Sequence, residues 1–234
     1  MGDHRRPGPQ GLPSGSGAPA VDPRLAAALT AQLERWRAAL AAGATRVGWK
    51  LGVGDAERIG DELAVGHLTS ATLLAPGAAY PAGEAAGLHA DAEVAFQVGP
   101  APGGDRGQEA WALSGVGVAL ELVDLAGPGT PEAAVAANIF HRAVAFGPFR
   151  PPPLPSGLHG RLLVNGRQAA SAPVAGDVAA RVAAAARVLA AVGERLQPGD
   201  RLITGSVVQV PVRPGDRVTA DLGSLGRVEL TVTA

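Results

Sequence analysis

The sequence predicts an α+β domain that is mostly β, with one helix near its start and one long helix near 176–192. Most of the chain after residue 46 consists of short apolar runs separated by glycine and proline, a pattern typical of strands. Apolar residues near the N-terminus instead recur at helical spacing, and the alanine-rich run at 176–192 is long enough to favour a helix. No repeat of fixed period is present, so the pattern indicates a globular domain.

The N-terminal segment divides into a tail and a helix. Residues 1–22 are rich in glycine, proline and serine and have almost no apolar content, so we expect a disordered tail. From Pro23 onward the apolar positions follow a helical period: Leu25, Leu29, Leu33, Trp36 and Leu40. Asp22-Pro23 suits a cap and first helical position, and the helix should end near Gly43.

The apolar runs after residue 46 are the candidate strands. They are 46–52, 91–98, 115–123, 161–165, 201–205, 217–221 and 226–232. Val192-Gly193 is a stop signal for the alanine-rich helix. The segment 147–155 contains five prolines, so we expect an irregular loop or crossing there. Residues 23–234 are expected to form one domain, of which 23–43 is the N-terminal helical segment.

Composition excludes several classes of function. The net charge is −1 and no basic run is interleaved with aromatic residues, which argues against a nucleic-acid partner. No apolar run is long enough to span a bilayer, and the N-terminus lacks the apolar core of a secretory signal. Without cysteine there is no disulfide, thiolate nucleophile or thiolate metal ligand. We therefore expect a soluble cytoplasmic protein with no membrane association.

Three acids lie inside apolar strand-like runs. Asp91 and Glu93 are two residues apart, so alternation along a strand sends both side chains to one face. Glu121 lies in a second run that is too apolar for a surface strand. Buried carboxylates without partners are costly, so these acids call for a shared cation, and oxygen ligands favour Mg²⁺ or Mn²⁺. The alternative is that the acids are solvated on an exposed face or paired with arginines.

Only one of the 20 basic residues is a lysine, Lys50. Arginine is a fixed, always-charged fork, whereas lysine is a compact donor with a flexible stem. A lysine that persists in such an arginine-rich chain, between glycines in an apolar run, is a candidate for a role that needs its amine. The alternative is a chance survivor whose stem packs on a strand and whose charged end reaches water.

These residues stand in an order that resembles a known family. The segments that carry the resemblance are Gly-Trp-Lys-Leu-Gly at 48–52, Asp-Ala-Glu-Val-Ala-Phe at 91–96, Ala-Leu-Glu-Leu-Val-Asp at 119–124, Leu-Ile-Thr-Gly-Ser at 202–206 and Pro-Gly-Asp-Arg-Val at 214–218. The sequence resembles the fumarylacetoacetate hydrolase superfamily, in its 2-keto-4-pentenoate hydratase and 4-oxalocrotonate decarboxylase branch. The similarity runs in consistent order from about Asp22 to the C-terminus, and the chain looks like a divergent member.

The resemblance implies a fold and a ligand set. The fold is a fumarylacetoacetate-hydrolase-like β-roll of mixed sheets that holds Mg²⁺ or Mn²⁺. The metal ligands of the family match Asp91, Glu93 and Glu121, and its active-site lysine matches Lys50. Members are usually homodimers or larger homo-oligomers, so we expect the same assembly here.

The resemblance also implies a reaction. In the hydratase branch a 2-hydroxydienoate tautomerises to a 2-oxo-enoate, and water is added through a metal-bound enolate. Lys50 would hold the substrate carboxylate or enolate, or move a proton. The substrate expected for this chain is therefore a small 2-oxo acid. Decarboxylation of a 2-oxo acid, C–C hydrolysis of an acylpyruvate and a non-catalytic divergent protein are the alternatives.

Some positions depart from the family pattern. Asp91 stands where glutamate is usual, and residues 63–69 lack the acid that hydratases carry there. A usual Asp-Asn-Ala-Ser stretch is represented only by Asn138, with His141 in the same region as a candidate replacement. His67 lies beside the expected cleft and is a second catalytic candidate.

Asn138, Gly205 and Ser206 are the candidate substrate-binding residues, with Gly205 in a turn or at a close backbone approach.

Overall fold

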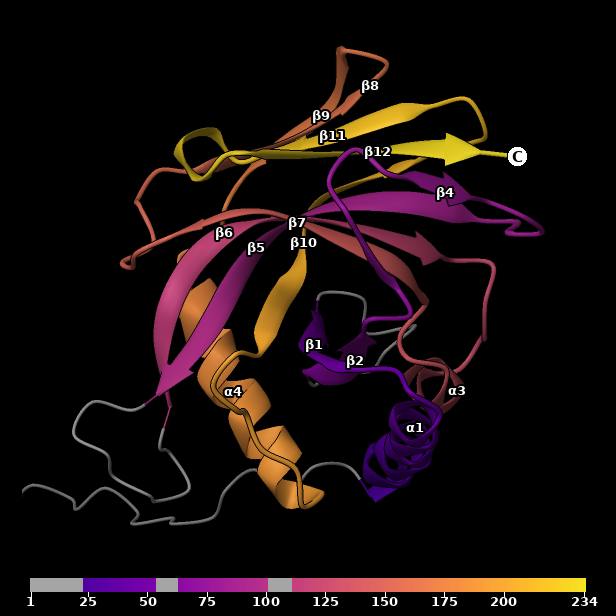
Figure 1. Ribbon diagram of the computed structural model, residues 1–234, viewed down its shortest axis with the longest axis vertical. Coiled ribbons are helices and arrows are strands. Elements are labelled where there is room, and N and C mark those ends of the chain that lie inside the picture. Colours follow the sequence, from indigo (N-terminus) through magenta and orange to yellow (C-terminus); the bar gives the residue numbers. More distant parts are fainter. Residues whose placement is uncertain (1–22, 54–62, 101–110) are drawn as a thin grey trace, which may run out of the picture.

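Two stacked β-sheets form the frame of the protein in its computed structural model (Figure 1). The structure describes residues 23–53, 63–100 and 111–234. Sheet A has seven strands in the order β2-β1-β10-β5-β6-β7-β3, and sheet B has five in the order β4-β12-β11-β8-β9. The architecture is α+β and mostly β, as the sequence predicts. The predicted tail at 1–22 lies outside the described residues.

The bounds of sheet A are β1 (Arg46–Gly52), β2 (Ala64–Thr69), β3 (Leu73–Leu74), β5 (Leu88–Pro100), β6 (Trp111–Asp124), β7 (His141–Arg150) and β10 (Arg201–Pro211). Those of sheet B are β4 (Ala79–Pro81), β8 (His159–Val164), β9 (Arg167–Pro173), β11 (Arg217–Asp221) and β12 (Arg227–Thr233). The helices are α1 (Pro23–Ala41), α3 (Pro131–Ala136), α4 (Val178–Ala191) and the 3₁₀ turn η2 (Gly223–Leu225).

The two faces of sheet A have different neighbours. Strands β11 and β12 of sheet B pack against β5, β6 and β7, and sheet B lies above them in Figure 1. Because side chains alternate along a strand, Ala92, Val94 and Phe96 of β5 enter the large core on that side. Asp91 and Glu93 alternate with these residues and therefore point to the other face of sheet A. Sheet A curves on that side, above α1 and α4 in Figure 1. The alternation thus separates the apolar core from the acids.

Apolar side chains share the acid-bearing face. Leu68, Ala95, Ala119, Val144, Phe146 and Ile203 form a second, smaller buried cluster there. The Arg201 guanidinium lies over the rings of Phe146 and Phe149, 5.3 Å and 5.8 Å from their centroids. One part of this interior is therefore filled by apolar packing, and the acids occupy another.

Several element bounds differ from the sequence prediction. β5 and β6 extend beyond 91–98 and 115–123, because they form one long antiparallel ladder from Leu88↔Asp124 to Pro100↔Trp111. The loop predicted over 147–155 is partly wrong, since β7 continues to Arg150. Pro148 is accommodated because the β6–β7 register shifts between Gly117 and Ala119, so no ladder hydrogen bond is required of it.

The strands that the sequence did not predict are β2, β3, β4, β7 and β9. β9 is an edge strand whose residues are mostly exposed, and β3 and β4 have only two and three residues, so none forms an apolar run long enough to predict a strand. The helices predicted over 23–43 and 176–192 are present as α1 and α4 within two residues at each end. No helix among the described residues is both long and apolar enough to cross a membrane.

An ion pair ties β1 to the turn before β10. The guanidinium of Arg46 binds both carboxylate oxygens of Asp200 at 2.6 Å. Trp49 Nε1 donates to the same carboxylate at 3.1 Å, and Arg46 lies over the rings of Trp36 and Trp49. Asp200 is 3 % exposed, so this pair is well shielded from water.

We expect Asp200→Asn to lower the free energy of unfolding by about 3 kcal/mol, because it leaves Arg46 without its buried counter-charge. Glu132→Gln is the matched control, since the Arg24–Glu132 pair is exposed and should contribute about 1 kcal/mol or less. Urea denaturation of both variants measures the difference. Equal losses would contradict a structural role for the buried pair.

Candidate metal centre

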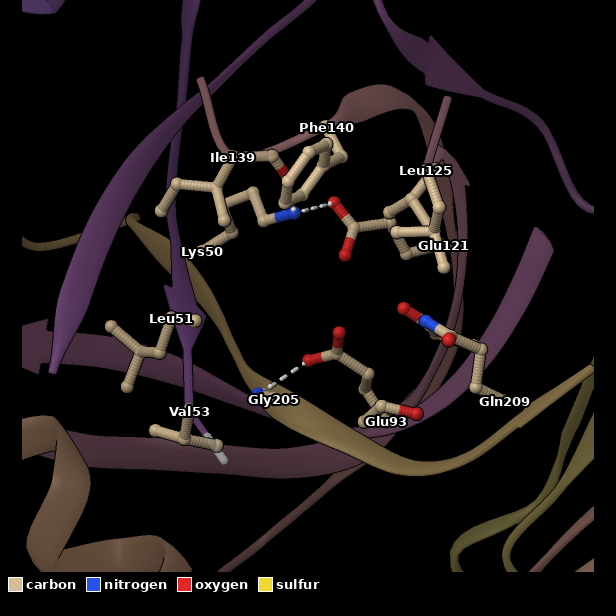
Figure 2. Close-up of a pocket in the computed structure, with 14 residues that line it drawn as sticks. Lys50, Leu51, Val53, Glu93, Glu121, Leu125, Ile139, Phe140, Gly205 and Gln209 are labelled. Carbon is tan, nitrogen blue, oxygen red and sulfur yellow. Dashed lines mark hydrogen bonds and ion pairs between the residues drawn. The ribbon is translucent and has the colours of Figure 1, made fainter. Parts of the chain in front are cut away.

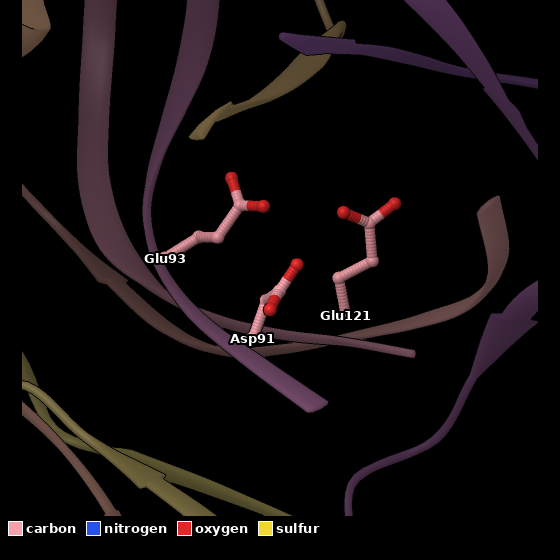
Figure 3. A group of neighbouring side chains, drawn as sticks. All are labelled: Asp91, Glu93 and Glu121. Atoms are coloured by element: carbon pink, nitrogen blue, oxygen red, sulfur yellow. The ribbon is translucent and has the colours of Figure 1, made fainter. Parts of the chain in front are cut away.

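Three carboxylates converge on the inner face of sheet A. Asp91 and Glu93 project from β5 with the same parity, and Glu121 stands directly opposite Asp91 on β6. Each residue offers one carboxylate oxygen to a group in which all oxygens lie within 4.8 Å of one another (Figure 3). All three residues are buried, with 5 % or less of each exposed. The convergence expected from the sequence is therefore present.

Lys50 lies against this acid cluster and has two partners. Its Nζ is 2.6 Å from Glu121 Oε1 (Figure 2) and also donates to the backbone carbonyl of Ile139 at 2.9 Å. Lys50 is 3 % exposed, so the alternative of a lysine reaching water from a strand edge is wrong. The ammonium supplies one positive charge beside three carboxylates.

Glu121 has a second neighbour behind the cavity. His141 Nδ1 lies 2.6 Å from Glu121 Oε1, and His141 Nε2 lies 2.9 Å from Thr72 Oγ1. Burial lowers the pKa of His141 although Glu121 opposes that shift, so the imidazole is neutral near pH 7. A neutral imidazole that donates from Nδ1 accepts at Nε2, which matches the Thr72 hydroxyl. His141 thus orients Glu121 and does not line the cavity.

An irregular part of β10 holds the other two acids. Its register to β5 shifts on both sides of Ser206, and the backbone N–H of Gly205 donates to Glu93 Oε2 at 2.7 Å (Figure 2). Gly205 has φ +93°, and a Cβ there would lie 2.4 Å from Val53 Cγ2, so only glycine fits. Gln209 is the register partner of Asp91, and the polar side chains of Gln209 and Ser206 lower the pKa of Asp91 against the effect of burial. The irregular part of β10 therefore supplies a backbone donor to Glu93 and places two polar side chains near Asp91.

The cluster opens into a cavity of about 340 Å³. Its polar lining consists of the three acids, Lys50, Ser206 and Gln209. The other lining residues are Leu51, Gly52, Val53, Val123, Leu125, Ile139, Phe140 and Gly205. Among the described residues, Lys50 is the one cation of this lining, and an apolar wall faces the polar groups.

Burial and mutual repulsion shift the acids in different directions. Burial raises the pKa of Asp91 to about 7, and the charge of Glu121 adds to that rise. Burial, then the charges of Glu121 and Asp91, raise the pKa of Glu93 well above its usual value. Burial alone would raise the pKa of Glu121, but Lys50 and then His141 lower it to about 2. Without a cation, Glu121 is ionised and the other two acids tend to hold protons.

These residues fit a hard divalent cation. Asp91 Oδ1 is buried and, within the described part of the chain, has no hydrogen-bond partner. Buried acceptors without partners are rare in native proteins and ask for an explanation such as an ion. Three carboxylates offer the oxygen ligands that Mg²⁺ and Mn²⁺ prefer and leave further positions for water or substrate. The three acids could therefore hold one such ion.

Two of the residues expected in the site lie elsewhere. His67 and Asn138 line a separate surface pocket with Arg35 and α3. His67 Nδ1 is 3.2 Å from Gln32 Oε1, and burial is the main cause that lowers the pKa of His67 to about 4. The Asn138 amide is bonded to the backbone of His67. Their catalytic and substrate-binding roles stay predictions, but neither side chain lines the cavity of the acid cluster.

Sequence reasoning missed several parts of the site. Gln209 was missed because its contact with Asp91 depends on the bulged register of β10, which no local pattern encodes. The carbonyl of Ile139 was missed because a backbone group leaves no mark in the residue types. Phe140 lines the cavity, and its aromatic side chain in the region of Asn138 and His141 was an available signal.

Comparison with solved structures gives the family context. The 4-oxalocrotonate decarboxylase from Pseudomonas putida G7 matches with a TM-score of 0.77 and covers 89% of this chain. Its complex with magnesium and adipate shows 24% identity over 86% of that chain, and its complex with calcium and acetate shows 25% over 85%. The fumarylpyruvate hydrolase from Pseudomonas aeruginosa, in complex with Mn²⁺ and pyruvate, has a TM-score of 0.59 and 18% identity, covering 81% of this chain and 90% of that chain.

No protein-family model matches the sequence, and the search of curated proteins also gave no match. The structural matches nevertheless confirm the resemblance drawn from the sequence: the chain has the fold of the fumarylacetoacetate hydrolase superfamily, at low sequence identity.

We expect the metal-free protein to be less stable at pH 8 than at pH 5.5. In the unfolded chain Asp91 has its ordinary pKa of 3.8 and is ionised at both values, whereas in the folded chain it keeps a proton up to about pH 7. The folded state therefore binds more protons in this range, and its stability falls as pH rises. Mn²⁺ should raise the melting temperature more at pH 8 than at pH 5.5, because fewer protons compete for the acids. A larger Mn²⁺ effect at pH 5.5 would contradict this.

Asp91→Asn should raise the metal-free melting temperature at pH 8, since it removes one buried negative charge, and should abolish the rise caused by Mn²⁺. Asp221→Asn is the matched control: Asp221 is 2 % exposed but faces Arg161 at 3.2 Å and Arg227 at 2.9 Å. That variant should lose stability and keep its response to Mn²⁺. Differential scanning calorimetry distinguishes the two patterns.

Proposed function

We propose that the protein is a divalent-metal-dependent lyase that acts on a small 2-oxo acid, with decarboxylation as the reaction that its site supports best. The observation that carries the proposal is the convergence of three buried carboxylates and one lysine beside an apolar wall. The structural matches to a decarboxylase and a hydrolase, solved with magnesium, calcium or Mn²⁺, support metal-assisted chemistry on an acid.

Asp91, Glu93 and Glu121 would hold the ion. When bound, the ion supplies Lewis-acid stabilisation of negative charge that develops on the substrate's 2-oxo oxygen. The contacts of Glu93 and Glu121 hold their carboxylates at the cavity: Glu121 contacts Lys50 and His141. The Gly205 N–H fixes Glu93, and Asp91 lies beside Ser206 and its register partner Gln209.

Lys50 would be the group of the protein that acts on the reacting atoms. Its Nζ stands at the cavity, held by Glu121 Oε1 and the Ile139 carbonyl, and retains a third N–H for a substrate oxygen. There it can bind the substrate carboxylate or the enolate oxygen, and it can deliver a proton as the enolate collapses.

The apolar wall favours loss of carbon dioxide. In a 2-oxo diacid the bond to the distal carboxylate breaks, its electron pair passes through the conjugated chain to the 2-oxo oxygen, and CO₂ leaves. A proton then adds to carbon. Val123, Leu125 and Phe140 line the cavity, and an ionised carboxylate beside such side chains is disfavoured relative to neutral CO₂.

Hydration, the reaction expected first from the sequence, is the second candidate. One observation favours it: the described lining holds no second cation besides Lys50, so the wall also suits a monocarboxylate with an unsaturated, uncharged tail. Water addition needs a further acid or base near the tail. The segment 63–69, where related hydratases carry an acid, contains none. A homodimeric or larger assembly and a cytoplasmic location stay predictions.

A direct assay separates the two candidates. The Mn²⁺-loaded protein is incubated with 4-oxalocrotonate, a 2-oxo diacid, and separately with a 2-hydroxydienoate monoacid. The proposal expects CO₂ release from the diacid, and no consumption of the monoacid. Consumption of the monoacid without CO₂ release would favour hydration, and no reaction with either would count against both.

We expect Lys50→Arg and Lys50→Met each to lower turnover by about 10²-fold or more, because a fixed guanidinium neither fits the space nor gives up a proton as an amine does. Both variants should still bind Mn²⁺, since the three acids remain. Isothermal titration with Mn²⁺ serves as the control for the site. Near-normal turnover by Lys50→Arg would remove Lys50 from the mechanism.

A further inference from the structure

A left-handed turn stands between α3 and β7 and forms part of the cavity wall. Three successive residues other than glycine have positive φ: Asn138 (65°), Ile139 (53°) and Phe140 (62°). Such angles are uncommon outside glycine, and for a β-branched residue such as isoleucine they are strained. Strain of this kind persists only where the surroundings determine the conformation.

The Asn138 side chain supplies such a constraint. Its Oδ1 accepts from the backbone N–H of His67 at 2.8 Å, and its Nδ2 donates to the backbone carbonyl of His67 at 3.0 Å. His67 lies in β2, an edge strand of sheet A, so the amide pairs with backbone groups of the edge as a further strand would. The next constraints are Ile139 N–H to Ala134 O at 2.8 Å and Asp124 N–H to Phe140 O at 2.9 Å.

The turn has a direct consequence for Lys50. In this conformation the Ile139 carbonyl accepts a hydrogen bond from the ammonium at 2.9 Å. Lys50 Nζ is therefore held between the carbonyl of Ile139 and the carboxylate of Glu121. Without the Ile139 carbonyl, Glu121 would be the one partner among the described residues that holds the Lys50 ammonium in place.

Gly66 completes the same arrangement from β2. Gly66 is the register partner of Lys50. The position that a side chain of residue 66 would occupy is already taken by atoms of Lys50 and Asn138. A Cβ at this position would lie 2.7 Å from Lys50 Cγ and 2.7 Å from Asn138 Oδ1. Any side chain here would displace the lysine stem, the Asn138 amide or both.

We propose that Asn138 and Gly66 are positioning residues for Lys50, forming a cradle that holds its amine toward the acid cluster. Asn138 acts through the Ile139 carbonyl, and Gly66 acts by leaving room for the stem. The proposal deepens the function proposed above, but the geometry of Lys50 can be measured without any substrate.

The chain offers an unusual probe, because Lys50 is its single lysine. Acetic anhydride modifies exposed amines, and peptide mass spectrometry follows acetylation of Lys50 in the folded, Mn²⁺-loaded protein. We expect Asn138→Gly and Gly66→Ala each to raise that rate about tenfold or more, because a hydrogen bond to the charged amine is lost or its stem is displaced. Asn138→Gly keeps a residue that tolerates positive φ, so the variant removes the side-chain constraint on the turn without adding a backbone penalty of its own.

Two matched controls separate this effect from general loss of stability. Asn165 also has positive φ (53°), and its amide binds Asp216 Oδ1 at 2.8 Å and the Arg217 N–H at 2.9 Å, remote from the cavity. Gly129 is exposed, with no atom within 4 Å of an added Cβ. Asn165→Gly and Gly129→Ala should leave the acetylation rate of Lys50 as it is in the parent protein.

The outcomes are distinct. Faster acetylation in the two cradle variants alone supports the proposal, whether or not a substrate has been found. Rates equal to the parent in Asn138→Gly overturn it, even if Gly66→Ala fails to fold. Where turnover of a 2-oxo acid is measurable, kcat should fall in Asn138→Gly while the Kd for Mn²⁺ is unchanged. Absence of turnover in the parent protein would count against the proposed function and leave the labelling result intact.

Discussion

The imbalance of charge inside sheet A is the constraint on which the site depends. Three carboxylates lie within 4.8 Å of one another, while Lys50 is the one ammonium among them. If all three acids were ionised, the buried cluster would carry two excess negative charges. The protein can relieve this with protons, as the raised pKa values of Asp91 and Glu93 indicate, or with one divalent cation. A dication matches the excess charge, and it would also give the unpartnered Asp91 Oδ1 a partner.

The rest of the fold isolates this charge. Alternation along β5 and β6 sends the residues of the large apolar core toward sheet B, and the acids toward the interior together with a smaller apolar cluster. The bulges of β10 break the regular ladder and turn the Gly205 N–H toward Glu93. On the far side, the strained turn at 138–140 presents its carbonyl to Lys50. Departures from regular structure in β10 and in the turn thus occur where the cluster needs extra donors and acceptors.

Much of this could be predicted from local pattern. The parity of Asp91 and Glu93, the apolar run around Glu121 and the isolation of Lys50 among arginines are all visible in single segments, and together they indicate one buried ionic site. The strands that were missed are short, lie at an edge or are interrupted by glycine and proline. Their sequences show no clear hydrophobic alternation, and they form strands because of their tertiary contacts. β7 is the clearest case, because a register shift admits Pro148.

The errors of placement have the same physical origin. His67 and Asn138 were expected at the cavity from the family resemblance. His67 is not there because side chains alternate across β2 and Gly66 is the register partner of Lys50. The contribution of Asn138 runs through backbone groups, at His67 and then at Ile139, and backbone contacts have no residue signature. Gln209 likewise reaches Asp91 only through the bulged register.

The most direct test of the account is the position of the ion itself. Crystals grown with Mn²⁺ give an anomalous difference map in which the metal can be located independently of any assumed chemistry. The expected result is one peak per chain, about 2.1–2.2 Å from an oxygen of each of Asp91, Glu93 and Glu121, within the range of metal–oxygen bonds. A cluster that stays free of anomalous density at saturating Mn²⁺, with Asp91 and Glu93 bonded instead to water or to each other, would contradict the account.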